Sequence, residues 1–587
     1  MADFACIRKS GVASNPDNPV IRYEPDESCP PWSVVATAVQ GVTLVLAPTI
    51  LVVAITVRSG GQDASFLTWA AFATLVIVGL MMAFQAAKVG RFGGGHLIIC
   101  GVTTNYIAVS IIALDQGGPA MVASLIVVSA IFYAAIAAWL PMLRKIITPT
   151  VAGTVLMLIA AITLPFAIDL IRSVPESAPS FAGTTIAAIT ALLSAALVLR
   201  APSLWRPWSI TLGIIAGCVA AALLGTYDPQ AFISAPLVGF PEIQFPGLEL
   251  TPGIEFFALL PLFLIVTLIQ AIKNISDGMI VQRISRRNPR ATDFRLIQGS
   301  IYANGTGILL SGVAGTPPTS TYPSLTVPLV NVTGVAARTV GYAMAAILLV
   351  LAFLPKVNGA LLTIPNPVLG GFLVFALGLV FIEGIQTLVR SGLNIQNAMV
   401  AGLAFGIGLG MQHHNLLSDF MPDPWGTLLG NGITVGTVTA VAFTVFLNLS
   451  NPRPRRIDTV LDEARLPRID EFLQSVGGEI GWNPSSIENL RAAGEETLDI
   501  LSNSSEGSEP PRLIVSARPQ PGSIELEFVT VSDETNIEDR IAFIDEDSET
   551  FDESDISLRL LRHYASSVKH QKYHGVDIVT LTVTGSK

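Results

Sequence analysis

A lysine and an aspartate lie inside an apolar stretch that is long enough to cross a lipid bilayer. The stretch covers residues 255–281, and it contains Lys273 and Asp277 four positions apart. In a helix this spacing places both side chains on one face, one turn apart. Charged side chains within a membrane span are rare and mark substrate or proton pathways. The two residues therefore predict a transport site, and both are candidate proton carriers.

The same two residues admit a second interpretation. Lys273 and Asp277 can form a closed ion pair that only neutralises two charges, because charges inside a membrane usually find a partner. The two interpretations are compatible if a ligand opens the pair. Glu383 stands seven residues before Arg390 in another apolar stretch. We interpret Glu383 as a packing charge near the cytoplasmic side and not as a proton carrier.

Composition places this site in a membrane protein. Of 587 residues, 51% are hydrophobic and 13% are charged, whereas a soluble chain carries about 25% charged residues. The deficit is confined to residues 33–449, the predicted membrane domain. Residues 1–32 are expected to be a polar, largely unstructured cytoplasmic leader, residues 450–456 a basic linker, and residues 457–587 a soluble domain. This last domain holds 26 acidic and 11 basic residues, so the net charge of −10 originates there.

Hydropathy predicts fourteen membrane-spanning segments in two groups of seven. With a cytoplasmic N-terminus, the loops on that side hold thirteen Lys and Arg residues, and the opposite loops hold only Arg58, Arg172 and Lys356. Basic loops stay cytoplasmic, so both termini are predicted to lie on the cytoplasmic side of a plasma or inner membrane. The predicted segments are residues 33–57, 66–87, 96–114, 120–143, 148–171, 180–199, 208–227, 255–281, 297–314, 322–332, 340–354, 368–389, 396–411 and 432–449.

Two of these segments are interrupted. The third reads RFGGGHLIICGVTTNYIAVSII and the tenth reads GTPPTSTYPSLTVPLV, with clustered glycines in one and four prolines in the other. Backbone groups freed by such breaks are tolerated in a membrane only where protein or a water-lined cavity satisfies them. Breaks at equivalent positions of two groups of seven indicate an inverted repeat with the site at its interface. Two kinked packing helices are the alternative.

Several runs resemble the nucleobase–ascorbate transporter family, the xanthine and uracil permeases, over residues 33–450. The most specific run is TGVAAR followed by PKVNGALLTIPNPVLGG, and RFGGGHLIICGVTTNYIAV and FALGLVFIEGIQTL also match. The resemblance implies a polytopic α-helical protein of fourteen segments in a 7+7 inverted repeat, with a core domain that moves against a gate domain. It also implies a short extended strand in the third and tenth segments, and nucleobase uptake coupled to H⁺ or Na⁺.

The chain departs from the family where the base is bound. Members usually carry a glutamate in the eighth segment, in a pattern like E-S-I-G-D, and the aligned run at residues 273–277 is K-N-I-S-D. In the tenth segment, a Gln or Glu followed by Asn is replaced by Leu325 and Thr326. A carboxylate accepts hydrogen bonds from a base, whereas an ammonium only donates. Lys273 therefore suits carbonyl oxygens or an anionic ligand.

The predicted site combines the eighth segment with the two interrupted ones. Backbone N–H groups at the starts of the two half-helices are expected to add donors. Gln40, in the first segment, matches a glutamine that is common in the family. The predicted substrate-binding residues are Lys273, Asp277, Ser324, Leu325, Thr103, Thr104, Asn105 and Gln40. The four cysteines lack metal-ligand spacing, so no metal is expected.

The acidic domain has an α+β pattern. Helices are predicted over residues 458–476, 485–501 and 556–567, and strands over 512–518, 523–531 and 576–583. The order faintly resembles the ATP-binding domains of anti-sigma factors and histidine kinases. The resemblance implies a Mg²⁺-holding Glu and Asn one turn apart, but the run from Glu495 to Ile500 has no such Asn, and residues 533–555 contain no glycine but many acids. Such a loop repels a triphosphate, so we expect a regulatory module without ATP binding.

These observations predict a secondary active transporter for a nucleobase-like substrate of the xanthine, uracil or purine class. It is expected to couple to protons, with Na⁺ as the other candidate ion, and to need no cofactor and catalyse no reaction. Two alternatives are a small-anion transporter on the same fold that uses Lys273, and a ligand-sensing receptor that signals through the C-terminal domain. The expected partners are a small-molecule substrate and the lipid bilayer. A homodimer and a cytoplasmic protein partner are compatible with the sequence, and nucleic acid is not expected.

Overall fold

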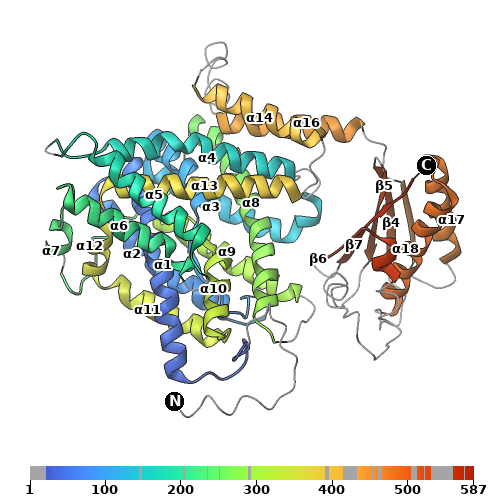
Figure 1. Cartoon of the computed structure of the whole chain (residues 1–587), viewed down its shortest axis with the longest axis horizontal. Helices are drawn as coiled ribbons and strands as arrows, with labels where there is room; N and C mark the ends of the chain where they lie inside the picture. Colours follow the sequence, from blue (N-terminus) through green and yellow to red (C-terminus); the bar gives the residue numbers. More distant parts are fainter. Residues whose placement is uncertain are drawn as a thin grey trace. The chain divides into compact units, whose positions relative to one another are not determined.

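The chain is described here by a computed structural model (Figure 1). The described residues are 21–90, 92–143, 149–176, 178–202, 205–234, 236–249, 251–287, 293–390, 395–413, 432–450, 455–460, 466–503, 512–520, 522–530, 560–573 and 576–586. They form two compact units. The first holds the described residues within 1–137, 152–287 and 296–437, and the second holds those within 138–151, 288–295 and 438–587.

Apolar helices build the first unit. Most carry hydrophobic residues all round and not on one stripe, as expected of helices that face lipid or protein on every side. They are α1 (Pro31–Ser59), α2 (Ala64–Ala86), α3 (Ile107–Leu143), α4 (Pro149–Arg172), α5 (Ala182–Arg200), α6 (Ser209–Leu223), α7 (Gln230–Ser234), α8 (Ile254–Ile284), α9 (Phe294–Ala314), α10 (Pro323–Thr333), α11 (Arg338–Ala352), α12 (Pro355–Leu362), α13 (Asn366–Arg390) and α14 (Ile395–His413), with the 3-10 turns η2 (Thr104–Tyr106) and η3 (Arg206–Trp208). A further apolar helix, α16 (Gly432–Ser450), begins in the first unit and belongs to the second from Val438 on.

Seven helices in the described part of the chain are long and apolar enough to cross a membrane. The number is eight if α11 and α12, which meet at an angle of 85°, are counted as one broken span. The chain is therefore a polytopic helical membrane protein. The predicted third and fourth segments join in the single helix α3, which contains a non-helical residue at Gly118, with a φ of 70°. A positive φ is readily adopted by glycine, so the chain can bend here. The count of fourteen spans stays a prediction.

The two predicted breaks are confirmed as extended backbone. Strand β1 (Cys100–Val102) follows the glycine cluster, and β2 (Thr319–Thr321) follows two prolines. The strands pair antiparallel, with Gly101 opposite Ser320. Each strand thus satisfies backbone groups of the other, which is how a broken span keeps its polar backbone inside a membrane protein. Both strands are fully buried.

The helices of the first unit pack as two groups. In what we call the first helix group, α2 packs on α11, α1 packs on both, and α8 packs on α10 and on the strand β2. Helices α3 and α9 belong to this group through contacts such as those of Gly312 with Val127 and of Gly307 with Thr319. In the second helix group, α5 packs on α6 and α13, and α13 also packs on α6.

Helix α4 joins the second helix group through glycines. A Cβ built on Gly153 of α4 would lie 2.6 Å from the carbonyl oxygen of Gly384 on α13, and a Cβ on Gly384 would lie 2.8 Å from the carbonyl oxygen of Gly153. Any larger residue would push the helices apart. Small residues at a crossing let two membrane helices approach closely, and dispersion contacts then stabilise the pair. The position of α13 is therefore tightly fixed within its own group.

The described end of the leader is ordered, which differs from the expected unstructured segment. Tyr23 forms a parallel bridge with Val335. The Arg287 guanidinium, directly after α8, donates to the carbonyl oxygens of Ile21 and Arg22 at 2.9 and 2.6 Å, and to both carboxylate oxygens of Glu27. We call residues 21–30 the N-terminal strap. It ties the end of α8 to the loop between α10 and α11, all within the first helix group.

The second unit contains an antiparallel five-stranded sheet in the order β3-β4-β5-β7-β6. The strands are β3 (Arg455–Val460), β4 (Arg512–Gln520), β5 (Ser523–Thr530), β6 (Ser567–Tyr573) and β7 (Val576–Thr584), and the helices α17 (Leu466–Ile480) and α18 (Pro484–Asn503) pack on the sheet. Alternate residues of β5 are buried, so one face of the sheet meets the helices. The core there includes Leu473, Leu490, Leu526, Phe528 and Leu581.

The sequence prediction missed two strands of this sheet. Strand β3 covers residues expected to form the linker and the start of a helix, because its basic and acidic residues hide the alternation. The predicted helix over residues 556–567 is also wrong at its end, since β6 begins at Ser567 and only residues 560–564 are helical among those described. The other strands and the helix over residues 485–501 are confirmed, whereas the helix expected from residue 458 begins only at Leu466.

Candidate functional site

One face of α8 carries a stripe of buried polar residues. Gln270, Asn274 and Asp277 recur at spacings of four and three, which aligns them on one side of the helix. Their exposed fractions are 0%, 1% and 4%. Because the stripe is buried, its polar groups must find their hydrogen-bond partners inside the protein.

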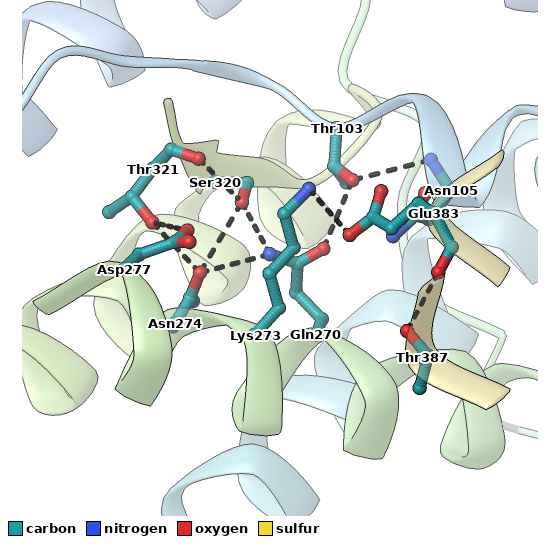
Figure 2. Close-up of polar contacts among 10 residues, drawn as sticks. All are labelled: Thr103, Asn105, Gln270, Lys273, Asn274, Asp277, Ser320, Thr321, Glu383 and Thr387. Carbon is teal, nitrogen blue, oxygen red and sulfur yellow. Dashed lines mark hydrogen bonds and ion pairs between the residues drawn. The ribbon is translucent and has the colours of Figure 1, made fainter. Parts of the chain in front are cut away.

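The two strand breaks supply those partners (Figure 2). Thr103, directly after β1, donates to Oε1 of Gln270 at 3.1 Å. The Gln270 amide donates to Oδ1 of Asn274 at 3.0 Å and also to the hydroxyl of Ser320 on β2. The hydroxyl of Thr321 lies 2.9 Å from Oδ1 of Asn274 and 2.8 Å from Oδ2 of Asp277. The breaks are thus held against α8 by their own side chains.

Tyr133 extends this network to α3 and α9. Its hydroxyl accepts from the amide of Asn274 at 2.5 Å and from that of Asn304 at 3.1 Å. Tyr133 is fully buried. We call Thr103, Tyr133, Gln270, Asn274, Asp277, Asn304, Ser320 and Thr321 the polar network. Because its members bond one another from α3, α8, α9 and both breaks, it fixes the site region of the first helix group.

The side chain of Lys273 points away from the polar network and toward α13. Its Nζ lies 3.3 Å from Oε1 of Glu383 on α13, as Figure 2 shows, and the two side chains are 28% and 34% exposed. The alternative of a closed ion pair between Lys273 and Asp277 is therefore wrong. Lys273 pairs with Glu383, and Asp277 accepts a hydrogen bond from the Thr321 hydroxyl. Glu383, which we interpreted from the sequence as a packing charge near the cytoplasmic side, instead pairs with a residue of the predicted site. Helix α13 turns Glu383 toward α8, which its position in the sequence did not reveal.

Asn105 lies beside this ion pair with an unused side chain. It is 1% exposed, and in the described part of the chain neither its amide nitrogen nor its amide oxygen has a hydrogen-bond partner. Its backbone N–H donates to the hydroxyl oxygen of Thr103 at 3.3 Å. An unsatisfied buried amide costs free energy. A side chain of this kind next to polar groups is therefore available to a ligand.

The other predicted site residues lie outside the polar network. Ser324 is exposed near the start of α10, and Leu325, Thr104 and Gln40 are half-buried. Of the eight predicted residues, the structure brings together Lys273, Asp277, Thr103 and Asn105. Those that the sequence prediction missed are Gln270, Asn274, Ser320, Thr321, Tyr133, Asn304 and Glu383. The spacing of Gln270, Asn274 and Asp277 was a visible signal for the buried stripe, whereas nothing local marked Tyr133.

A separate apolar pocket lies between α1, α6 and α12. It has a volume of about 490 Å³ and shares no residue with the polar network. Its lining is Thr43, Leu46, Ala47, Thr211, Ile214, Ile215, Cys218, Val219, Ala222, Tyr227, Ala360, Leu361 and Ile364. It offers few polar groups to orient a ligand.

Comparison with known proteins assigns the membrane part. A family model described as a permease family matches residues 33–417, which is well over half of the chain. The chain belongs to this permease family. The resemblance to the xanthine and uracil permeases, drawn from the sequence motifs, is thereby confirmed, and the protein is a membrane transporter and not an enzyme. The match ends before the C-terminal domain.

Individual relatives agree with this family assignment. Xanthine permease XanP of Escherichia coli (strain K12) is 29% identical over 392 residues, covering 63% of this chain and 82% of the relative. The putative purine permease CPE0397 of Clostridium perfringens is 26% identical over 421 residues, covering 71% of this chain and 90% of the relative. A solved structure, the transmembrane domain of a cyanobacterium bicarbonate transporter BicA, aligns with a TM-score of 0.44 at 16% identity, over 70% of this chain and 97% of that one.

Proposed function

We propose that this permease is a secondary active transporter of a nucleobase-like substrate, coupled to protons. The observation that carries the proposal is Asn105, a buried amide with a donor and an acceptor unused among the described residues, beside a preformed polar network. A nucleobase presents ring N–H groups next to ring carbonyls, which an amide complements with two hydrogen bonds. Relatives named as xanthine and purine permeases support the same substrate class.

The proposed transport cycle uses the groups around α8. Lys273 and Asp277 are the candidate proton carriers, because they are ionisable groups inside a membrane helix at the site. The polar network keeps the two breaks in place while the substrate binds. We further propose fourteen spans in a 7+7 inverted repeat, with the first and second helix groups as core and gate, and both termini cytoplasmic.

A small-anion transporter is the second candidate. Lys273 favours it, but Lys273 already has Glu383 as a partner, and Asp277 stands one turn away. One ammonium group and two carboxyl groups give no net positive charge to attract an anion. The charges that surround Lys273 therefore favour a neutral polar ligand over chloride or sulfate.

A ligand panel tests the proposed function. Uracil, xanthine, urate, chloride and sulfate would be assayed by thermal shift and by radioligand uptake into proteoliposomes, with an imposed proton or sodium gradient. We expect saturable binding of a nucleobase, uptake that the proton gradient drives, and at least tenfold weaker binding in Asn105→Leu. Binding of anions alone would overturn the substrate class, and uptake that needs sodium would overturn proton coupling.

A further inference from the structure

The ion pair between Lys273 and Glu383 connects the two helix groups. Lys273 belongs to α8, which packs on α10 and β2, and Glu383 belongs to α13, which packs mainly on α5 and α6. The contact of α13 with the first helix group is much smaller and involves α1 and η2. The pair therefore lies at the seam between two separately packed bundles.

The pair is accessible, unlike the polar network. Its side chains are 28% and 34% exposed, while the network residues on α8 are at most 4% exposed. A partly exposed ion pair contributes little to stability wherever water reaches both charges. Polar groups of a ligand can compete in the same way. The pair can thus open without unfolding its surroundings.

Glu383 is also well placed to reach a ligand at Asn105. Helix α13 contacts η2, the turn that carries Asn105. Figure 2 shows Glu383 and Asn105 on the same side of the Lys273 side chain. The residue after Glu383 is Gly384, which packs against Gly153 of α4, so the backbone at this point of α13 is fixed. The carboxylate is therefore presented from a rigid support.

The two charges offer opposite hydrogen-bonding roles. A carboxylate only accepts and an ammonium only donates. A ring N–H next to a ring carbonyl needs one acceptor and one donor side by side, and the pair at 3.3 Å provides them. We propose that Glu383 is a substrate-binding residue whose carboxylate accepts from a ring N–H of the nucleobase, while Lys273 donates to the neighbouring carbonyl oxygen.

This inference rests on the proposed function and extends it. It assigns substrate selection to the carboxylate of Glu383, in the second helix group, because α8 of the first helix group offers a lysine at position 273 and not a carboxylate. A substrate held in this way bridges both groups, so its binding opens the direct ion pair and replaces it with two hydrogen bonds of the charged type. Such bonds are stronger than neutral ones and depend on geometry.

N-methylated ligands test the assignment. The full-length protein in detergent would bind xanthine or uracil, whichever has the higher affinity for the wild type, in competition with each of its singly N-methylated analogues. In the wild type, methylation of the N–H that meets Glu383 should weaken binding about 10- to 100-fold. In Glu383→Leu this ratio should fall to within about threefold, and Glu383→Gln, which keeps an acceptor oxygen, should be intermediate. Glu255→Gln, an exposed change in the first turn of α8, is the matched control.

The outcomes separate this inference from the proposed function. A wild type that binds neither xanthine nor uracil overturns the proposed function, and this inference with it. A wild type that binds a nucleobase but tolerates every N-methyl group, or a Glu383→Leu protein that keeps the wild-type ratio, overturns this inference alone. Equal weakening of methylated and unmethylated ligands in Glu383→Leu means a structural role for Glu383 and also overturns it.

Discussion

Two neighbouring faces of α8 differ in how their polar groups are held. On one face, Gln270, Asn274 and Asp277 are buried and bonded to neutral side chains of the two strand breaks. On the adjacent face, the half-exposed Lys273 reaches a single charged residue of another helix group. The first face resembles the interior of a rigid protein, and the second resembles an interface.

The difference indicates a division of roles along one helix. Buried hydrogen-bonded networks fix a local structure and are costly to disturb. A partly exposed ion pair costs less to open. Helix α8 can therefore remain fixed in the first helix group while its Lys273 changes partners.

Removal of Asn274 should have the largest effect. Asn274→Leu keeps the size but deprives Tyr133, Gln270 and Thr321 of a partner. The buried groups left behind should cost about 3 kcal/mol of unfolding free energy, whereas Lys273→Gln should cost less than about 1 kcal/mol. Thermal unfolding in detergent measures both, with Asn331→Leu, exposed on α10, as the control. A larger loss for Lys273→Gln than for Asn274→Leu would contradict the division.

Reversal of the charges should affect ligand binding more than stability. Lys273→Glu alone and Glu383→Lys alone each place two like charges together, and each should weaken nucleobase binding by about 100-fold. The double variant restores an opposite pair and should regain about tenfold. Equilibrium binding of the four proteins forms a double-mutant cycle. If the two single effects simply add in the double variant, the residues do not act as a pair.

The N-terminal strap should show a small, pH-dependent effect. The Arg287 guanidinium, which donates to Glu27, holds the pKa of that carboxyl below its ordinary value of 4.5. Because the folded pKa is lowered, the contribution to stability is complete above pH 4.5 and is lost as the pH falls further. Glu27→Gln should therefore lower the midpoint of thermal unfolding by about 1–2 °C at pH 7, and the difference should vanish near pH 3. A difference that grows on acidification would contradict this sign.

Loss of the C-terminal domain should have the smallest effect on binding. Strand β3 begins at Arg455, so a stop codon at that position removes the whole five-stranded sheet without cutting it. We expect nucleobase affinity and uptake to stay within about twofold, because the site residues all belong to the first unit. Complete loss of uptake, with the truncated protein still folded by size-exclusion chromatography, would favour the sensor hypothesis.

The sequence predicted the parts of the site that depend on local pattern. The apolar stretch around Lys273 identified α8, and the glycine and proline clusters identified both strand breaks, because these residues act on their own backbone. The partner of Lys273 could not be predicted from the sequence, because two acidic residues were candidates. Asp277 lies four positions along the same helix, and Glu383 lies on a helix that is distant in the chain. Burial of Tyr133 among Asn274 and Asn304 depends equally on the packing of α3 against α8 and α9, which no local run of residues specifies.

The most direct test is the structure of the protein with a bound nucleobase. We expect ligand density between Lys273 and Glu383, within hydrogen-bonding distance of Asn105, with the direct contact of 3.3 Å between Nζ and Oε1 opened beyond 4 Å. Ligand density in the apolar pocket between α1, α6 and α12, with the ion pair still closed, would contradict it.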